Sequence, residues 1–335
     1  MISKDPIDII EIKSDADEVV LGNETRNSLK SKASTFHPLL LWDEKGLKYF
    51  EAITYAPEYY LTNCEIELLE KHSDEIAQAL APDSVLVELG SGCLRKVKIL
   101  LEAIERSQKR VDYYALDLDR SELERTLRDI KPGEFQYVRC HGLFGSYDDG
   151  LDWLRSSEMS SKPRCIMSLG STLGGFDRQE AAKFLSRFAN LPGPPSSAGN
   201  STLMLIGLDG CLDGQKVWSA YNDSEHRNER FIRNVLTHAN GVLGQEIFRQ
   251  EDWEHRGKWN AESKRHEQYL IPKKDIEFEG RWLTAGEEVF VVASQKYGPE
   301  ERETLWRHSG LRPVKEWHTQ SHGYGLHLMT ATHPN

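Results

Sequence analysis

The sequence predicts an α/β fold with a doubly wound, mostly parallel sheet, and three observations support this. A run of strand-forming residues, Val85–Leu89, leads into a glycine-rich turn. A helix-like stretch, Leu94–Ile104, follows the turn, and a second strand-like run, Tyr113–Leu118, follows the helix. Further strand candidates then alternate with helical stretches, which is typical of βαβ units.

The turn after the first strand, Glu88-Leu-Gly-Ser-Gly92, has the character of a nucleoside site. Gly90 and Gly92 lack a Cβ, so the backbone can approach a ligand closely there. An acid, Asp117, stands at the end of the second strand, where a carboxylate can accept hydrogen bonds from two ribose hydroxyls. Strand, turn, helix, strand and acid together predict half of a nucleotide-binding fold.

Two classes of ligand compete for this turn. A dinucleotide-binding oxidoreductase has a third glycine, but the corresponding position here is Arg95. The acid that precedes the first glycine, Glu88, is typical of methyltransferases that bind S-adenosylmethionine. We therefore favour a methyltransferase over an NAD-linked enzyme or a purely structural turn.

Composition limits the partners and the compartment. The chain has 335 residues, 28% of them charged, and a formal net charge of −11. This charge argues against a nucleic-acid partner, because phosphate binding needs a basic surface. No apolar run is long enough to cross a bilayer, and the polar N-terminus has no secretory signal. The five scattered cysteines form no Cys-x-x-Cys pair, so neither a zinc site nor a disulfide framework is expected. The cytoplasm is the default compartment, and we expect a monomer.

The remaining elements follow from apolar periodicity and turn residues. Residues 1–36 are polar and are expected to be partly extended. Helices are expected at Asp43–Ala52, at Cys64–Leu80 with Thr62 or Asn63 as cap, and at Pro299–Ser309. Strands are expected at Phe135–Arg139, Cys165–Leu169, Leu203–Leu208, Asp275–Phe278 and Val289–Ser294, with an antiparallel pair at Val314–Trp317 and Gly325–Thr332. Leu191–Asn200 is expected to be a surface loop.

Seven blocks of sequence occur in the order found in one family. They are Pro57–Thr62, Glu88–Gly92 with Lys96, Tyr114–Asp117, Leu169–Gly174, Ala220–Asp223 with Arg233–Val235, Lys258–Asn260, and Ala285–Glu288. On these blocks the chain resembles the amino-acid α-N-methyltransferases related to the histidine methyltransferase of ergothioneine biosynthesis. The family's fungal branch includes the dimethylallyltryptophan N-methyltransferase of ergot alkaloid pathways.

The resemblance implies a two-part architecture and a reaction. Residues 64–210 and 297–335 would form a Rossmann-like domain of the class I methyltransferase type, and residues 1–63 and 211–296 a smaller α+β substrate-binding lobe. The cofactor would be S-adenosylmethionine, with S-adenosylhomocysteine as product. The expected cofactor-binding residues are Glu88, Gly90, Ser91, Gly92, Lys96, Asp117, Leu118, Leu143, Phe144, Gly170 and Ser171, while Thr172 is a further candidate.

The resemblance also assigns substrate residues. Tyr59 and Tyr221 stand where the family has tyrosines around the amine and carboxylate, and they are the catalytic candidates. Gly175 stands where the family has an asparagine that contacts the amino-acid head group, so Asn228 or a water is expected to take that contact. The other expected substrate-binding residues are Trp42, Gln268, Val292 and Ser294.

Val292 indicates which amino acid is methylated. It occupies the position of the glutamate that binds the imidazole in the histidine enzyme. A buried imidazole with one unpaired nitrogen costs about 1–3 kcal/mol, whereas an apolar wall suits an indole. The sequence therefore favours L-tryptophan; L-histidine, L-tyrosine, dimethylallyltryptophan and a non-catalytic cofactor-binding protein remain alternatives.

No metal site is expected. The histidines His255, His266, His318, His322, His327 and His333 lack the HExxH spacing and a convergent acid, so surface or structural roles are expected for them.

Overall fold

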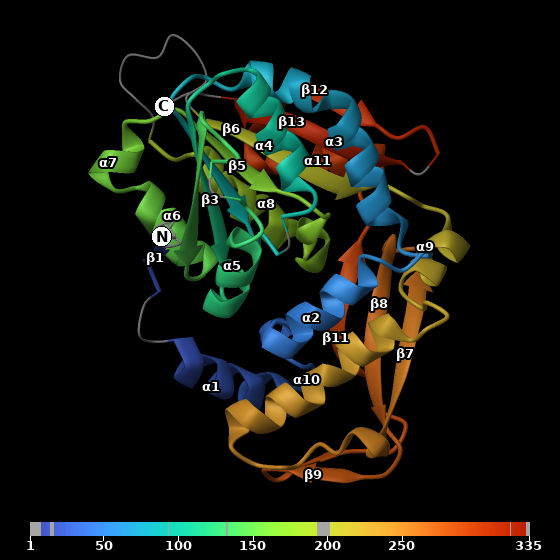
Figure 1. The fold of residues 1–335 in the computed structure, drawn as a ribbon. Coiled ribbons are helices and arrows are strands. Elements are labelled where there is room, and N and C mark those ends of the chain that lie inside the picture. The colour runs from blue at the N-terminus through green and yellow to red at the C-terminus, as the bar shows by residue number, and fades with distance from the viewer. Residues whose placement is uncertain are drawn as a thin grey trace. The chain divides into compact units, whose positions relative to one another are not determined.

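The computed structural model describes residues 8–13, 17–92, 94–131, 133–192, 202–321 and 323–332. The chain forms two compact units (Figure 1). The first unit comprises residues 1–13, 61–211 and 296–335, and the second comprises residues 14–60 and 212–295. Among the described residues, no helix combines the length and the apolar character that crossing a membrane requires.

The first unit is built on one sheet of eight strands in the order β1-β4-β3-β2-β5-β6-β13-β12. All neighbours from β1 to β6 pair in parallel, while β13 is antiparallel to both β6 and β12. This is the predicted doubly wound, Rossmann-like sheet. The strands are β1 Ile9–Glu11, β2 Ser84–Leu89, β3 Val111–Asp117, β4 Val138–Phe144, β5 Arg164–Ser168, β6 Thr202–Asp209, β12 Leu311–His318 and β13 Tyr324–Ala331.

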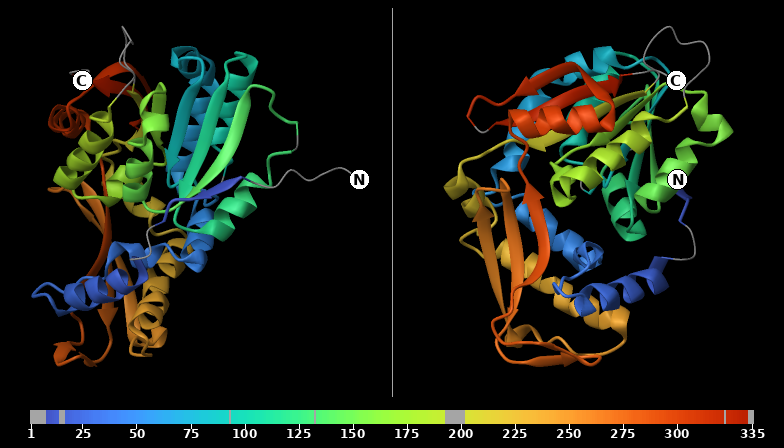
Figure 2. Two further views of the ribbon diagram at one scale, coloured as in Figure 1. Left: turned by 90° about the vertical axis from the view of Figure 1, so that its left-hand side faces the viewer. Right: turned by 180° about the vertical axis from the view of Figure 1, so that it is seen from behind.

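Helices cover both faces of this sheet (Figure 2). On one face the core consists of apolar side chains from the central strands and from α6, α8 and α11, with Leu151, Leu185 and Trp306 among them. The helices of this unit are α3 Tyr60–Ala79, α4 Val97–Arg106, α5 Arg120–Leu127, α6 Tyr147–Leu154, α7 Ser157–Ser160, the 3₁₀ turn η2 Thr172–Gly175, α8 Arg178–Ala189 and α11 Pro299–Ser309.

The second unit combines an antiparallel sheet with helices. The sheet has the order β11-β8-β7, and a separate hairpin pairs β9 with β10. The helix α10 packs on α1, α2 and η1 and also contacts β7 and β8. The elements are α1 Asp17–Lys30, η1 Pro38–Leu41, α2 Glu44–Ile53, α9 Gly214–Ala220, α10 Arg227–Leu243, η3 Gln250–Asp252, β7 Trp253–Asn260, β8 Arg265–Pro272, β9 Ile276–Phe278, β10 Arg281–Leu283 and β11 Val289–Gln295.

Several sequence-based expectations are confirmed. The helix Pro299–Ser309 has the expected bounds, and β12 and β13 form the expected antiparallel pair. The strands β2, β3, β5 and β6 lie within about a residue or two of their predicted positions. The loop expected at 191–200 lies largely outside the described residues.

Other expectations were wrong, and tertiary contacts explain why. No helix was expected in residues 1–36, yet residues Asp17–Lys30 form the helix α1, which packs against α10 and buries Leu29. The proposed caps Thr62 and Asn63 lie inside α3, which begins at Tyr60. The start of the chain was assigned to the substrate lobe, but β1 pairs with β4 in the first unit.

Three strands of the second unit, β7, β8 and β10, were missed, as was β1 of the first unit, and one strand of the first unit was misplaced. The strands β7 and β8 carry charged and amide side chains among their apolar residues, so they lack a plain period-two pattern. The strand β4 spans Val138–Phe144 rather than the expected Phe135–Arg139.

A buried ion pair fixes the start of the C-terminal segment in the first unit. The Lys296 Nζ lies 2.7 Å from a carboxylate oxygen of Asp209, and both side chains are fully buried. The other carboxylate oxygen of Asp209 accepts a hydrogen bond from the Cys211 backbone N–H at 2.9 Å. Since Asp209 is the last residue of β6, the pair joins the end of that strand to the segment that leads into α11.

Replacing Lys296 by Met should destabilise the first unit by about 3–5 kcal/mol, because the substitution leaves the Asp209 charge buried without its cation. The D209N/K296M double variant removes both charges and should recover much of that loss. Urea unfolding followed by circular dichroism would measure both. A double variant no more stable than K296M would contradict this account.

Candidate functional site

The glycine-rich turn after β2 has left-handed backbone conformations at its two glycines, which residues with a Cβ rarely adopt. Gly90 and Gly92 adopt left-handed conformations, with φ of 67° and 49°. A Cβ on Gly90 would lie 2.7 Å from the hydroxyl oxygen of Tyr147. Between the glycines, the buried Ser91 hydroxyl has no hydrogen-bond partner among the described residues. The turn therefore presents an unused polar group at the carboxyl end of the central strands.

Asp117 lies beside this turn, as predicted. It ends β3, and one of its oxygens accepts a hydrogen bond from the Gly92 N–H at 3.3 Å. The other accepts the Asp119 N–H at 3.2 Å. Burial raises the pKa of Asp117 to about 6. A carboxylate so placed retains lone pairs for ribose hydroxyls, so the turn and this acid fit an adenosyl group.

Glu88 is buried within β2 and is bound by the neighbouring strand. The Tyr113 hydroxyl donates to its carboxylate at 2.5 Å. Burial raises the pKa of Glu88 to about 7, and the nearby charges of Glu65 and Asp117 act in the same direction. Its assignment as a cofactor ligand stays a prediction.

The structure reveals a buried acid that sequence reasoning missed. The carboxylate of Glu65, on α3, accepts the Lys96 ammonium at 2.6 Å and the Tyr324 hydroxyl at 2.7 Å. It also accepts the Gly170 backbone N–H, at 2.8 and 3.0 Å to its two oxygens. The one available signal was an acid on a helix face otherwise lined by Leu68 and other apolar residues.

Two predicted cofactor residues meet at this acid. Lys96 was expected to bind the cofactor, and its ammonium is bound to Glu65. Gly170 has a φ of 72°, and a Cβ there would lie 2.9 Å from the Lys96 nitrogen. Glu65 therefore positions both residues at the carboxyl end of the sheet.

The loop after β5 continues the predicted cofactor site. Ser171 has a left-handed φ of 56°, and its hydroxyl accepts the Asp209 backbone N–H at 3.0 Å. The Thr172 hydroxyl donates to the Leu169 carbonyl at 2.8 Å. Both side chains thus stabilise the loop. Gly175 is exposed, and a Cβ there would meet no atom within 4 Å, so the missing head-group asparagine leaves open space in this unit.

The three apolar cofactor candidates differ in access. Leu118, which follows β3, is 39% exposed and can cover a ligand. Phe144 is half-buried, with the Lys13 ammonium 5.6 Å from its ring centroid. Leu143 is fully buried in the core, so its side chain is less accessible than those of the other two, and its assignment to the cofactor site stays a prediction.

The predicted substrate residues of the second unit gather on one face of its three-stranded sheet. Gln268 lies opposite Val292, and His266 lies opposite Ser294. Directly opposed residues of antiparallel strands point to the same face. The Tyr221 ring stacks on His266 at 4.8 Å, and its hydroxyl lies 2.6 Å from the Ser294 hydroxyl.

An aromatic cluster in the same unit holds the remaining candidates. The rings of Tyr59 and Tyr221 pack edge to face, with centroids 5.8 Å apart. Trp42 packs against Phe50 and Phe231, with centroids 5.2 and 5.4 Å away. The two catalytic candidates are therefore neighbours.

The two amide candidates differ in their bonding. The Asn228 side-chain nitrogen donates to the Tyr221 carbonyl at 2.7 Å and so stabilises the end of α9, and its predicted contact with the head group stays a prediction. The Gln268 carbonyl oxygen lies 2.6 Å from the His255 Nε2. The Gln268 amide nitrogen is buried and has no hydrogen-bond partner among the described residues.

Comparisons with known proteins agree with this geometry. Residues 21–331 match the family of histidine-specific, S-adenosylmethionine-dependent methyltransferases. The chain is 43% identical over 326 residues to ergothioneine biosynthesis protein 1 of Neurospora crassa, covering 96% of this chain and 36% of that protein. It is 34% identical over 327 residues to the 4-dimethylallyltryptophan N-methyltransferase of Claviceps purpurea, covering 92% of this chain and 94% of the relative.

The parallel sheet, the glycine turn and the acid that ends β3 define a Rossmann-like methyltransferase of class I, with S-adenosylmethionine as cofactor. Within that class, the chain belongs to the histidine-specific methyltransferase family. The match covers only 36% of the length of the Neurospora relative.

Replacing Asp117 by Ala should abolish S-adenosylmethionine binding in a folded protein, because the ribose loses its charge-assisted acceptor. Calorimetric titration would measure the affinity, and circular dichroism the fold. D129A, which removes an exposed acid after α5, is the matched control and should bind normally. Unchanged affinity in D117A would remove Asp117 from the site.

Replacing Glu88 by Gln should stabilise the protein at pH 8 but not at pH 4. Because burial raises the pKa of Glu88 to about 7, the folded state retains a proton that the unfolded chain releases near pH 4.5. The contribution of Glu88 to the stability of the wild type is therefore fully present below about pH 4.5. This contribution is lost as the pH rises through about 7. At pH 8 the gain should reach about 3 kcal/mol at most.

Unfolding free energies from urea titrations at both pH values would measure this difference. E102Q, on the exposed face of α4, is the control and should show no such trend. An E88Q gain that does not grow with pH would contradict the assigned cause.

Proposed function

We propose that this chain transfers a methyl group from S-adenosylmethionine to the α-amino nitrogen of an aromatic amino acid, L-tryptophan foremost. The membership of the methyltransferase family supports the reaction. The observation that carries the choice of substrate is Val292, an apolar residue on the face that also bears Tyr221, Gln268 and Ser294.

When bound, S-adenosylmethionine supplies an electrophilic methyl group on a sulfonium. The chain's own residues must bind the amino acid and present its nitrogen as a neutral amine with an oriented lone pair. Tyr59 and Tyr221 supply hydroxyl groups for this, and the bond between Tyr221 and Ser294 fixes one of them. A solvent water removes the proton from the ammonium, since neither tyrosine is a strong base at neutral pH.

The half-buried Val292 favours an indole over an imidazole. It lies opposite Gln268, so no carboxylate faces the side-chain pocket at this position. An imidazole placed there would leave a nitrogen unpaired at a cost of about 1–3 kcal/mol, whereas an indole gains from apolar contact.

One observation favours L-histidine as a second candidate. The buried Gln268 amide nitrogen has no partner among the described residues, and it is a donor. The acceptor nitrogen of a neutral imidazole would satisfy this donor, whereas an indole N–H would not. The 43% identity to the Neurospora ergothioneine protein points in the same direction.

The decisive experiment offers the purified chain S-adenosylmethionine with L-tryptophan, L-histidine, L-tyrosine or 4-dimethylallyltryptophan and identifies products by mass spectrometry. N-methylated tryptophan at the highest rate would support the proposal. Preferred methylation of L-histidine would overturn the choice of substrate. Cofactor binding without any product would overturn the proposed activity and indicate a non-catalytic relative.

Replacing Val292 by Glu should shift specificity towards L-histidine by about 1–3 kcal/mol in relative kcat/KM. The new carboxylate would have to be desolvated against an indole but would pair with an imidazole. Steady-state rates with both amino acids would measure the ratio. V314E, on an exposed position of β12, is the control and should leave the ratio unchanged. An unaltered ratio in V292E would show that Val292 does not face the amino-acid side chain.

A further inference from the structure

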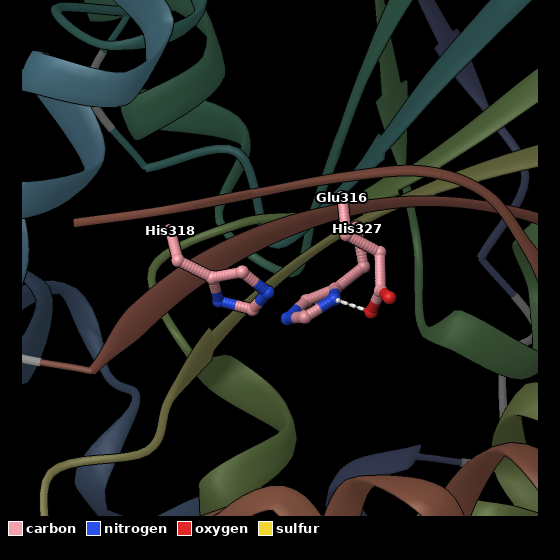
Figure 3. Close-up of side chains that lie close together, drawn as sticks. All are labelled: Glu316, His318 and His327. Atoms are coloured by element: carbon pink, nitrogen blue, oxygen red, sulfur yellow. Dashed lines mark hydrogen bonds and ion pairs between the residues drawn. The ribbon is translucent and has the colours of Figure 1, made fainter. Parts of the chain in front are cut away.

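The hairpin of β12 and β13 brings together a cluster that the methyl-transfer residues do not use. Glu316, His318 and His327 lie on one face of this hairpin, and their potential ligand atoms all lie within 4.8 Å of one another (Figure 3). The register explains the proximity, because Glu316 lies opposite His327 and His318 lies opposite Gly325. Although no sequence spacing of the common zinc motifs is present, strand pairing supplies the convergence.

His327 is oriented as metal-binding histidines are. Its ring is fully buried, and its Nδ1 lies 2.7 Å from a Glu316 carboxylate oxygen. A carboxylate can only accept, so Nδ1 carries the proton, and in the neutral ring Nε2 keeps a lone pair. That buried Nε2 has no hydrogen-bond partner among the described residues. A carboxylate on the far nitrogen is the usual outer partner of a histidine that binds a metal.

The lone pair of His327 borders a space that it shares with His318. A Cβ built on Gly325 would lie 2.6 Å from the His327 Nε2 and 2.7 Å from the His318 Nδ1. Figure 3 shows nitrogen atoms of the two rings turned toward each other. Because position 325 is a glycine, both rings can approach its Cα, and any larger side chain there would force the two nitrogens to move.

The charges around the cluster limit which cation fits. Arg302, on α11, is within electrostatic reach of both histidines and of Glu316. Its charge opposes a hard cation held by electrostatics alone, and Glu316 offsets it only in part. Imidazole nitrogens bind late first-row metals through covalent character, so Zn²⁺, Ni²⁺ or Cu²⁺ suits this site and Mg²⁺ or Ca²⁺ does not.

We propose that His318 and His327 bind a late first-row divalent metal ion, with Zn²⁺ as the representative case. His327 binds through Nε2, Glu316 holds its other nitrogen, and the exposed side of His318 leaves room for water ligands. The ion would join β12 to β13 at the end of the hairpin that is next to Tyr324. This proposal is independent of the substrate of methyl transfer.

Calorimetric titration of the untagged full chain with ZnCl₂ tests the site. The wild type should bind one Zn²⁺ with an affinity that H318Q and G325A lower at least about tenfold, while E316Q should lower it about 10–100-fold. His318 is exposed, so H318Q should fold normally, and circular dichroism would verify this. H226Q is the control, because His226 is an exposed histidine paired with Glu229 in the second unit.

A second readout is thermal stability, since an ion that binds only the folded state raises the Tm. Saturating Zn²⁺ should raise the Tm of the wild type and of H226Q by about 2 °C or more, and Mg²⁺ should not. Zn²⁺ binding with the same affinity in H318Q and G325A would overturn the proposal, as would a wild type that shows no binding. Equal stabilisation by Mg²⁺ would overturn the assigned metal class.

Discussion

At the edge of the first unit's sheet where the cofactor residues are predicted, the arrangement of the chain depends on the buried carboxylate of Glu65. A buried charge persists only when donors surround it, and this one has a lysine ammonium, a tyrosine hydroxyl and a backbone N–H. These donors are Lys96 before α4, Tyr324 at the start of β13 and Gly170 after β5. One carboxylate thus holds three segments that are distant in sequence, and each segment carries or adjoins residues assigned to the cofactor.

The same region is rich in buried acids. Glu88 lies close enough to Glu65 and to Asp117 for their charges to interact, and burial raises the pKa of both Glu88 and Asp117. Lys96 is the nearby cation that acts on Glu88. Excess negative charge of this kind favours a cationic ligand, and S-adenosylmethionine carries a positive sulfonium and an ammonium. Ionising the buried Glu88 beside these acids costs free energy of folding. The folded protein therefore loses stability as the pH rises from about 4.5 through about 7.

In the second unit, polar side chains on one face of the three-stranded sheet are covered by ring packing and joined by hydrogen bonds. Tyr221 covers His266 and bonds to Ser294, while Asn228 holds the Tyr221 carbonyl from α10. Val292 interrupts this polar pattern. A face with fixed hydroxyls at one position and an apolar residue at another can distinguish the head group of an amino acid from its side chain.

The sequence by itself determined the parallel sheet, the glycine turn, the acid that ends β3 and the family, because these depend on local patterns and on short blocks that resemble the family's sequence. Only the tertiary structure decided the partners of Lys96, the bonding of Asn228, the burial of Leu143 and the helix α1. The convergence of His318 with His327 belongs to the same group. In each of these cases the deciding contact joins residues that are distant in sequence. The sequence of one chain does not indicate which distant side chains will be buried together.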